Sequence, residues 1–199
     1  MTGTLNKSEC SLYSQNHVPL RGADRIYDRL FYAQYQLGQL RPSRNWCDEG
    51  RRRFPDNYRF TECQLWLLAA PSETTDVDAA WELLAQLDSL VPESIWAYKH
   101  SVGEIMIAGV LGKAGLPDSA SSVFARVDQS EEIDPQRNLM HFEAGIRAST
   151  GDAEGALTAL RRWAAATQGG TLGEGGDLHW WWRDLRSHPE FQQFVDRGN

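Results

Sequence analysis

Four segments of the sequence repeat one pattern: an apolar stretch with helical spacing, a short break, and a second helical stretch that opens with a small residue. The small residues recur at intervals of 37, 40 and 36 positions, at Ser43, Ala80, Ala120 and Ala156. A sustained period of this length is typical of an array of equivalent supersecondary units, each of which buries its apolar face against its neighbours. The pattern therefore predicts a chain built from stacked helix pairs.

The composition favours the same class. The chain has 20 Ala and 21 Leu but only 8 Val and 6 Ile. Good helix formers thus outnumber the β-branched aliphatic residues that sheets prefer. A β-sandwich or a parallel-sheet protein is therefore not expected, and the predicted fold class is all-α.

The pattern divides the chain into a repeat region and two ends. The repeat region covers residues 23–167, with units at 24–57, 58–94, 95–134 and 135–167. The remaining parts are a polar N-terminal arm at 1–22, a Gly-rich loop at 168–176 and a Trp-rich C-terminal cap at 177–199. We expect the arm to be flexible, with a recognition role as the alternative. The Gly-rich loop lacks the lysine of a phosphate-binding loop and is predicted to be a flexible connector.

The first unit carries the residues of a known repeat. They are Leu30 and Phe31 in its first helix, Gly38 in the turn, then Ser43, Cys47, Gly50 and the closing Pro55. With this register the chain resembles the tetratricopeptide repeat, a helix–turn–helix unit of about 34 residues, over residues 24–167. The unit at 58–94 departs from the family by lacking the turn glycine. The tail at 179–191 resembles the end of repeat regions that accompany bacterial kinase, cyclase or activator domains, with His188 where the family has Asp.

This resemblance implies a fold and a function. The fold is a right-handed superhelix (an α-solenoid) of about four antiparallel helix pairs with a C-terminal capping helix. The function is a non-catalytic protein–protein interaction module with a scaffold or regulatory role, which binds a peptide or helix of a partner in its concave groove. By the family's register the residues presented to that groove are Arg25, Asp28, Tyr32, Tyr35, Gln36, Val102, Ile105, Gly109, Lys113, Asn138, His141 and Ala148.

The C-terminal cap has its own pattern. Ser187 is placed to cap a last helix with Pro189 in its first turn. The run of Trp180, Trp181 and Trp182 is interpreted as a hydrophobic lid, with a partner-binding anchor as the alternative. At most two of three consecutive helical residues face one core, so we expect at least one of the tryptophans to be exposed or at a contact.

Charge and cysteine content limit the partners and the compartment. A net charge of -7 argues against binding nucleic acid or an anionic membrane. No apolar run approaches the ~20 residues that span a bilayer. Cys10, Cys47 and Cys63 form no disulfide or zinc pattern, so reduced cysteines and a cytoplasmic location are expected.

Two alternatives to peptide binding stay open. A homodimer could form through the Trp-rich cap or the first helix. A small-molecule or metal sensor could use His100, Glu104 and His141, since the first two lie four residues apart on a helix. No catalytic constellation, cofactor or dedicated metal site is predicted. The run Arg51, Arg52 and Arg53 is interpreted as a solvated helix end, with an acidic-partner contact as the alternative.

Overall fold

The computed structural model describes residues 22–71, 74–173 and 175–195. Within these ranges the chain forms eight α-helices and no β-strand, so the all-α prediction is confirmed. The helices are α1 (Ala23–Gln36), α2 (Leu40–Arg53), α3 (Tyr58–Ala69), α4 (Val77–Leu90), α5 (Trp96–Lys113), α6 (Pro117–Arg126), α7 (Asn138–Ser149) and α8 (Ala153–Ala166). Apart from Gly22, the predicted N-terminal arm lies outside the described residues. No described helix combines the length and the apolarity needed to span a bilayer.

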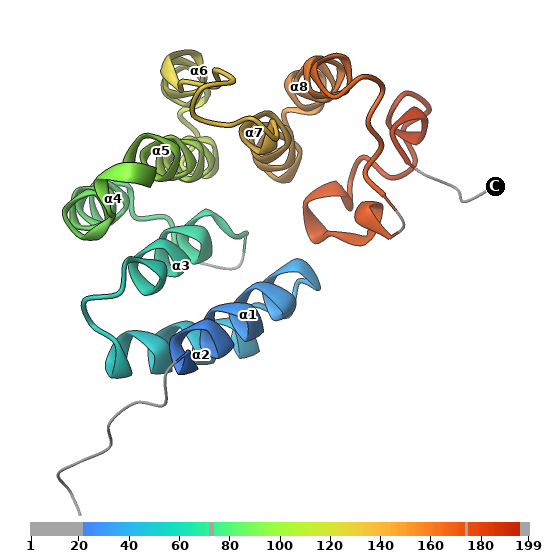
Figure 1. The fold of residues 1–199 in the computed structure, drawn as a ribbon. Coiled ribbons are helices and arrows are strands. Elements are labelled where there is room, and N and C mark those ends of the chain that lie inside the picture. Colours follow the sequence, from blue (N-terminus) through green and yellow to red (C-terminus); the bar gives the residue numbers. More distant parts are fainter. Residues whose placement is uncertain (1–21, 72–73, 174, 196–199) are drawn as a thin grey trace, which may run out of the picture.

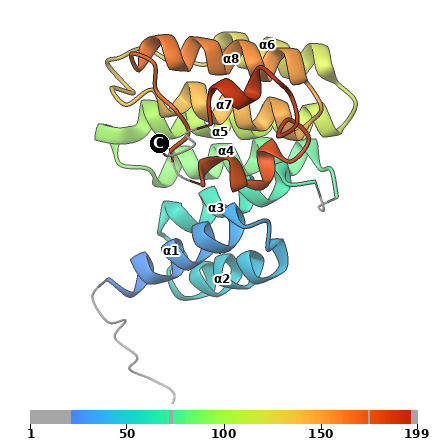
Figure 2. The same ribbon diagram turned by 90° about the vertical axis from the view of Figure 1, so that its right-hand side faces the viewer.

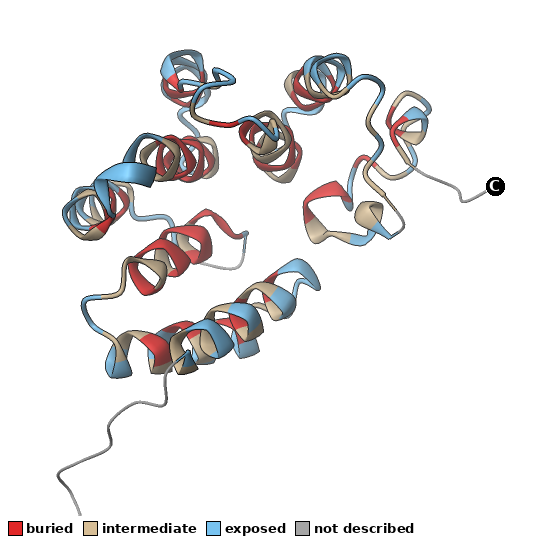
Figure 3. Ribbon diagram, in the orientation of Figure 1, coloured by how far each residue is buried: buried red, intermediate tan, exposed pale blue. Residues whose placement is uncertain are grey.

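The helices pack as sequential pairs: α1 with α2, α3 with α4, α5 with α6, and α7 with α8. The odd-numbered helices also contact one another in order, from α1 to α3, α5 and α7. We call these four helices the inner row, because they lie on the inside of the curved arrangement in Figure 1. The C-terminal segment faces the inner row, as Figure 2 shows from the side. Burial is concentrated where neighbouring helices meet, most of all along α5 (Figure 3).

The small residues of the repeating pattern lie where the sequence analysis placed them. Ser43, Ala80, Ala120 and Ala156 are all buried. Two glycines within helices also allow a neighbouring helix to pack closely. A Cβ on Gly50 would overlap the ring of Phe60, and one on Gly103 would overlap Leu84. The period of small residues is therefore a consequence of helices packing at short distance.

Three of the four helix pairs are joined through a turn that contains a glycine, as the sequence pattern predicts for the first of them. Gly38, Gly115 and Gly151 have φ angles of 71°, 74° and 86°, the left-handed conformation that ends a helix at little cost for glycine. The helix α4 is capped by Asp76, whose carboxylate accepts a hydrogen bond from the backbone N–H of Ala79 at 2.9 Å. The helix boundaries were thus largely readable from local sequence.

The cysteine prediction is wrong for two of the three residues. Cys47 in α2 and Cys63 in α3 form a disulfide, with their Cα atoms 6.0 Å apart. The spacing of the two cysteines matches no motif that would predict the pair. They meet because α2 packs on α3. The prediction of a reducing compartment assumed that the cysteines form no disulfide, so the Cys47–Cys63 bond removes the support for it. Cys10 lies outside the described residues.

The predicted C-terminal capping helix is also wrong. Residues 175–195 contain only short 3₁₀ turns: η2 (Gly176–Leu178), η3 (Trp180–Trp182) and η4 (Phe191–Gln193). Ser187 caps no helix, and the N–H of Glu190 donates instead to Nδ1 of His188 at 3.3 Å. Arg186 holds the segment as a loop by donating to the carbonyl oxygens of Asp177 and Leu178 at 2.9 and 2.8 Å.

The 3₁₀ turn changes how the three tryptophans face the core. Trp181 and Trp182 are 2% and 0% exposed. Trp180 is partly buried, and its ring packs on Tyr35 of α1 with the ring centroids 5.5 Å apart. None of the three is therefore exposed. A tighter turn inserted between α7 and α1 can bury side chains on more than one side, which a helix lying on one surface cannot.

Candidate functional site

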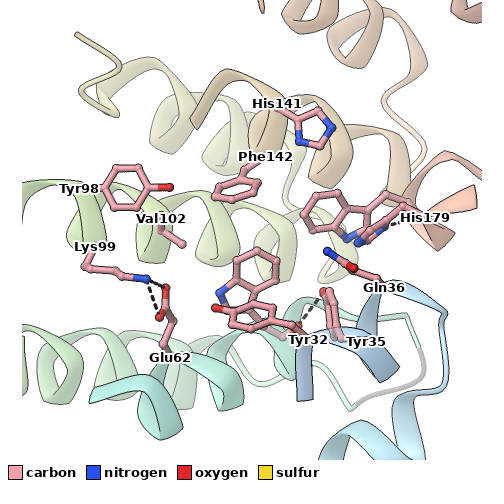
Figure 4. A pocket seen from close by; sticks show the side chains of 12 residues that line it. Tyr32, Tyr35, Gln36, Glu62, Tyr98, Lys99, Val102, His141, Phe142 and His179 are labelled. Carbon is pink, nitrogen blue, oxygen red and sulfur yellow. Dashed lines mark hydrogen bonds and ion pairs between the residues drawn. The ribbon is translucent and has the colours of Figure 1, made fainter. Parts of the chain in front are cut away.

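A cavity of about 280 Å³ lies between the inner row and the C-terminal segment (Figure 4). Each helix of the inner row contributes to its wall, and η3 with the preceding residue closes one side. The lining residues are Tyr32, Tyr35, Gln36, Glu62, Trp66, Tyr98, Lys99, Val102, His141, Phe142, His179 and Trp181. Gln36 is exposed, so the cavity reaches the surface there. The site thus joins residues that are far apart in the sequence.

The wall of the cavity is mostly aromatic. Trp66 stacks on Trp181, with ring centroids 5.7 Å apart and planes 18° apart. The edges or faces of Tyr32, Tyr35 and Phe142 meet Trp66 at nearly right angles, at centroid distances of 5.5, 5.5 and 5.4 Å. Edge-to-face and offset contacts of this kind are favourable beyond the area they bury. The arrangement gives the cavity a firm wall.

Tyr35 links two helices of the inner row. Its hydroxyl donates to the backbone carbonyl oxygen of Trp66 at 3.2 Å. Burial raises the pKa of Tyr35, so the hydroxyl keeps its proton near neutral pH. The side chain of Tyr35 therefore connects α1 to α3 through a hydrogen bond.

One end of the cavity is charged. Glu62 of α3 is 2% exposed, and Nζ of Lys99 in α5 donates to its two carboxylate oxygens at 2.7 and 2.8 Å. Asp28 of α1 lies close to this pair; burial raises its pKa, while the positive charge of Arg59 opposes the rise. Burial likewise raises the pKa of Tyr98 to about 12. The charged end is thus held out of water, where electrostatic interactions are strong.

The opposite end carries two histidines. Burial lowers the pKa of His141 to about 4 and, together with the nearby His141, lowers that of His179 to about 3. Both rings are therefore neutral near pH 7. Nδ1 of His179 accepts a hydrogen bond from the backbone N–H of Trp181 at 3.2 Å, which assigns the ring proton to Nε2.

The structure brings together some of the predicted groove residues. Tyr32, Tyr35, Gln36, Val102 and His141 line the cavity. The others do not line it: Arg25, Asp28, Ile105, Gly109, Lys113, Asn138 and Ala148.

The residues outside the cavity have other contacts. Ile105, Gly109 and Ala148 are buried where inner-row helices meet. Nζ of Lys113 donates to the carbonyl oxygens of Leu68 and Ala70 at 2.7 and 2.5 Å, at the C-terminal end of α3. The family register assigned these residues to the groove face, but the helix packing turns them toward neighbouring helices.

Two residues of the hypothesised metal site lie together, since Nε2 of His100 is 3.8 Å from Oε1 of Glu104, but His141 does not join them. Nδ1 of His100 lies 3.0 Å from Asp88, and Glu104 accepts a hydrogen bond from Nε of Arg126 at 2.7 Å. His141 lies at the cavity instead, against Trp182 with ring centroids 5.5 Å apart. The described part of the chain contains no group of three or more residues placed to hold a metal ion. The helices α5 and α7 do pack on each other, but His141 lies at the cavity and not beside His100 and Glu104.

Sequence reasoning missed the charged pair and most of the aromatic wall. Trp66 and Phe142 line the cavity but are not among the predicted groove residues. Glu62 and Lys99 were not singled out. A usable signal was present for Glu62, because it is an acidic residue within the apolar run from Phe60 to Leu68. Carboxylates are rarely fully buried without a partner, so such a position indicates a paired charge.

Comparisons with protein-family models, with curated proteins and with solved structures give no significant match. The functional argument therefore rests on the geometry of the chain itself.

Proposed function

We propose that this chain is a non-catalytic binding module that takes a segment of a partner protein on the face of its inner row. The sequential pairing of helices supports this proposal, since the resemblance to tetratricopeptide repeats implies a right-handed superhelix with a binding face on its inner side. Fold alone hosts many functions, so the site must carry the argument.

The single observation that carries the proposal is the aromatic cavity with its buried ion pair. A concave, mostly apolar site with a few converging polar groups is the usual form of a binding pocket. Its volume of about 280 Å³ lies at the lower end of the range for such pockets. A helix, about 10–12 Å across with its side chains, does not fit into it. The proposal is therefore an extended peptide that inserts one bulky side chain or one chain end.

The C-terminal segment limits how much of the inner face a partner can cover. Trp180 contacts Tyr35 of α1, and Trp181 contacts Trp66 of α3. The segment thus occupies the part of the inner face between α7 and α1. A partner helix lying along the whole inner row would have to displace it, which again favours a short peptide.

A selection experiment tests the proposal. Peptides selected from a displayed random library against the full chain should bind less tightly by at least about tenfold to Val102→Phe, whose larger ring fills the cavity. Ile26→Phe is the matched control, because Ile26 is 60% exposed and lies outside the cavity. Peptides that bind Val102→Phe as well as the wild type, or a selection that yields no binder, would count against the proposal.

A free small molecule is the second candidate ligand. His179 and Trp181 close one side of the cavity. A cavity closed in this way covers much of the surface of a small ligand, which favours this candidate. Self-association is a weaker candidate. Trp181 and Trp182 are buried within the chain. The exposed large apolar side chains of α1, its C-terminal end and the Trp-rich cap are those of Ile26, Leu37 and Leu178, which are 60%, 65% and 63% exposed. Light scattering on the purified chain tests it: a monomer at micromolar concentration would exclude a tight dimer.

A further inference from the structure

We propose that a groove at the start of α5 binds an arginine side chain of a partner protein, with the methylene stem along the groove floor and the guanidinium group among the carboxylates of the wall. This inference goes beyond the proposed function, because it concerns a second site with its own ligand chemistry. Three observations carry it: a lining without any cation, a buried carboxylate without a cationic partner, and apolar side chains exposed beside the carboxylates.

The groove has a volume of about 560 Å³, and we call it the edge groove. It lies between the 3₁₀ turn η1 (Glu93–Ile95), together with the first turn of α5, and the loop that precedes α7. Most of its lining residues are exposed, so it opens to solvent. Tyr98 also lines the aromatic cavity, so the two sites adjoin. The lining residues are Glu93, Ser94, Ile95, Ala97, Tyr98, Glu132, Ile133, Asp134, Pro135, Gln136 and Asn138.

The lining of the edge groove carries three carboxylates and no Lys, Arg or His. Glu93 and Glu132 are exposed, and neither has an ion pair or a side-chain hydrogen bond within the described part of the chain. The base nearest to them in the loop, Arg137, pairs instead with Glu131 at 2.9 Å. A cationic group that enters the groove therefore meets negative charge that the chain itself does not balance.

Asp134 is the residue that points to a ligand. It lines the groove although it is only 3% exposed. Its Oδ2 accepts a hydrogen bond from the backbone N–H of Leu139 at 2.7 Å. Among the residues that the structure describes, no Lys, Arg or His pairs with this carboxylate, and its Oδ1 accepts no hydrogen bond. Carboxylates are almost never this buried unless a cation pairs with them, so a ligand that supplies the cation is favoured here.

Apolar side chains border the carboxylates. Ile95 and Ile133 belong to the lining, and Ile95 is 36% exposed. Trp96, the neighbour of Ile95 in the chain, is 41% exposed. An arginine side chain buries its methylene stem along apolar surface while its charged end stays among polar groups. The combination of an apolar floor and an acidic wall therefore fits a basic side chain, and it disfavours an anion.

The arrangement of the carboxylates favours a guanidinium group over a metal ion. The described residues contain no group of three or more acidic, His or Cys side chains placed to hold a metal ion. The carboxylates of Glu93, Glu132 and Asp134 therefore do not converge on one point. A guanidinium group has five N–H donors in a planar fork, so it can contact carboxylates that lie apart, whereas the ammonium group of lysine is a compact point charge.

The test uses the full chain and two displayed heptapeptide libraries, one with Arg and one with Gln fixed at the central position. Binders from the Arg library are synthesised again with citrulline, the neutral isostere of arginine, at that position. The Arg peptides should bind at least about tenfold more tightly than their citrulline counterparts. Added salt should weaken the binding of the Arg peptides more than that of the citrulline peptides.

Matched variants locate the effect. Glu132→Gln changes an exposed side chain, so the fold should be retained, and Arg peptides should bind about threefold to tenfold less tightly. Glu154→Gln is the control, because it removes the same charge from an exposed position on α8 outside the groove, and it should leave binding unchanged. Asp134→Asn keeps an oxygen that can accept from Leu139, and it should also weaken binding. Thermal melting checks the fold of this variant.

The outcomes separate this inference from the proposed function. Citrulline peptides that bind as tightly as Arg peptides, an Arg library that yields no binder, or equal effects of Glu132→Gln and Glu154→Gln would each overturn the inference. Arg peptides that respond to Val102→Phe and not to Glu132→Gln would overturn it while supporting peptide binding in the aromatic cavity. The reverse response would support the edge groove whatever the cavity binds.

A second copy of the chain is the competing occupant. Light scattering on the free chain tests it. Self-association that Glu132→Gln abolishes and Glu154→Gln retains would assign the edge groove to a second copy and overturn the inference.

Discussion

The indole ring of Trp181 lies directly on the backbone of Gly145, so closely that a Cβ on this glycine would overlap the ring. The same ring stacks on Trp66 at a centroid distance of 5.7 Å. Trp181 thereby joins the C-terminal segment to α7 and to α3. The cavity, which is lined by both tryptophans, depends on this contact.

We expect Gly145→Ala to destabilise the fold. The added methyl group has no space unless Trp181 moves, and overpacking of this kind costs about 1–3 kcal/mol. The gain in helix propensity, about 1 kcal/mol, offsets part of that cost. Urea unfolding measures the net change, and limited proteolysis reports whether residues 175–195 become cleavable.

Gly112→Ala is the control for this prediction. A Cβ on Gly112 would lie 3.2 Å from Thr150, a contact that a small shift relieves. Its unfolding free energy should stay within about 1 kcal/mol of the wild type. Equal behaviour of the two variants would show that Trp181 does not rest on Gly145 in solution.

The sequence predicted the paired helices well, because their determinants are local. Ser43 and Ala80 are small for a reason that repeats in every unit, and Gly38 and Gly151 end helices through their own backbone conformation. These predictions used only the position of a residue within one helix or turn. The common face of Tyr35 and His141 was implied by the register of the repeat family, and both residues line the cavity.

The cavity and the disulfide could not be predicted in this way. Trp181 meets Trp66 across more than a hundred residues of sequence, and the turn that positions it is a 3₁₀ turn with no periodic pattern. Cys47 meets Cys63 only through the packing of α2 on α3. In both cases the determinant is contact between elements, which a single sequence does not show.

Loss of the disulfide should lower the free energy of unfolding. The bond joins residues 16 positions apart, and closing a loop of that size in the unfolded chain stabilises the fold by about 3 kcal/mol. Cys47→Ala/Cys63→Ala, made in a Cys10→Ser background, should show this loss in urea unfolding. Thiol titration of the oxidised, denatured wild type should detect one thiol out of three cysteines. Detection of all three would show that the bond does not form.

Acid should destabilise the fold through its two buried histidines. Burial lowers the pKa of His141 to about 4 and that of His179 to about 3, whereas an unfolded histidine titrates near pH ~6.5. The unfolded chain therefore binds more protons below about pH 6.5, so stability falls as the pH drops through that value and stops falling below the folded pKa. For His141 alone the loss is on the order of 3 kcal/mol at about pH 4.

His141→Gln isolates this effect from the titration of carboxylates. The variant cannot take up a proton at position 141, so its unfolding free energy should fall less steeply between about pH 6.5 and pH 4. Urea unfolding followed by Trp fluorescence at several pH values measures both slopes. Parallel slopes for the wild type and the variant would contradict a buried neutral His141.

Removing Lys99 should lower the free energy of unfolding, because the buried carboxylate of Glu62 loses its cationic partner. Lys99→Ala leaves the carboxylate of Glu62, 2% exposed, without its partner, and breaking a buried ion pair in this way costs about 3–5 kcal/mol. Arg161→Ala is the control, because its pair with Glu190 is exposed to solvent and such pairs contribute little to stability. Replacing both Lys99 and Glu62, as Lys99→Ala/Glu62→Gln, should recover part of the stability, since no buried charge is then unpaired.

The same variant allows chemical rescue. Ethylammonium should raise the melting temperature of Lys99→Ala more than sodium at equal ionic strength, because it can occupy the space left by the Lys99 side chain and pair with Glu62. It should have no such effect on Lys99→Ala/Glu62→Gln, which lacks the buried carboxylate. Equal shifts with the two cations would contradict pairing of ethylammonium with the Glu62 carboxylate.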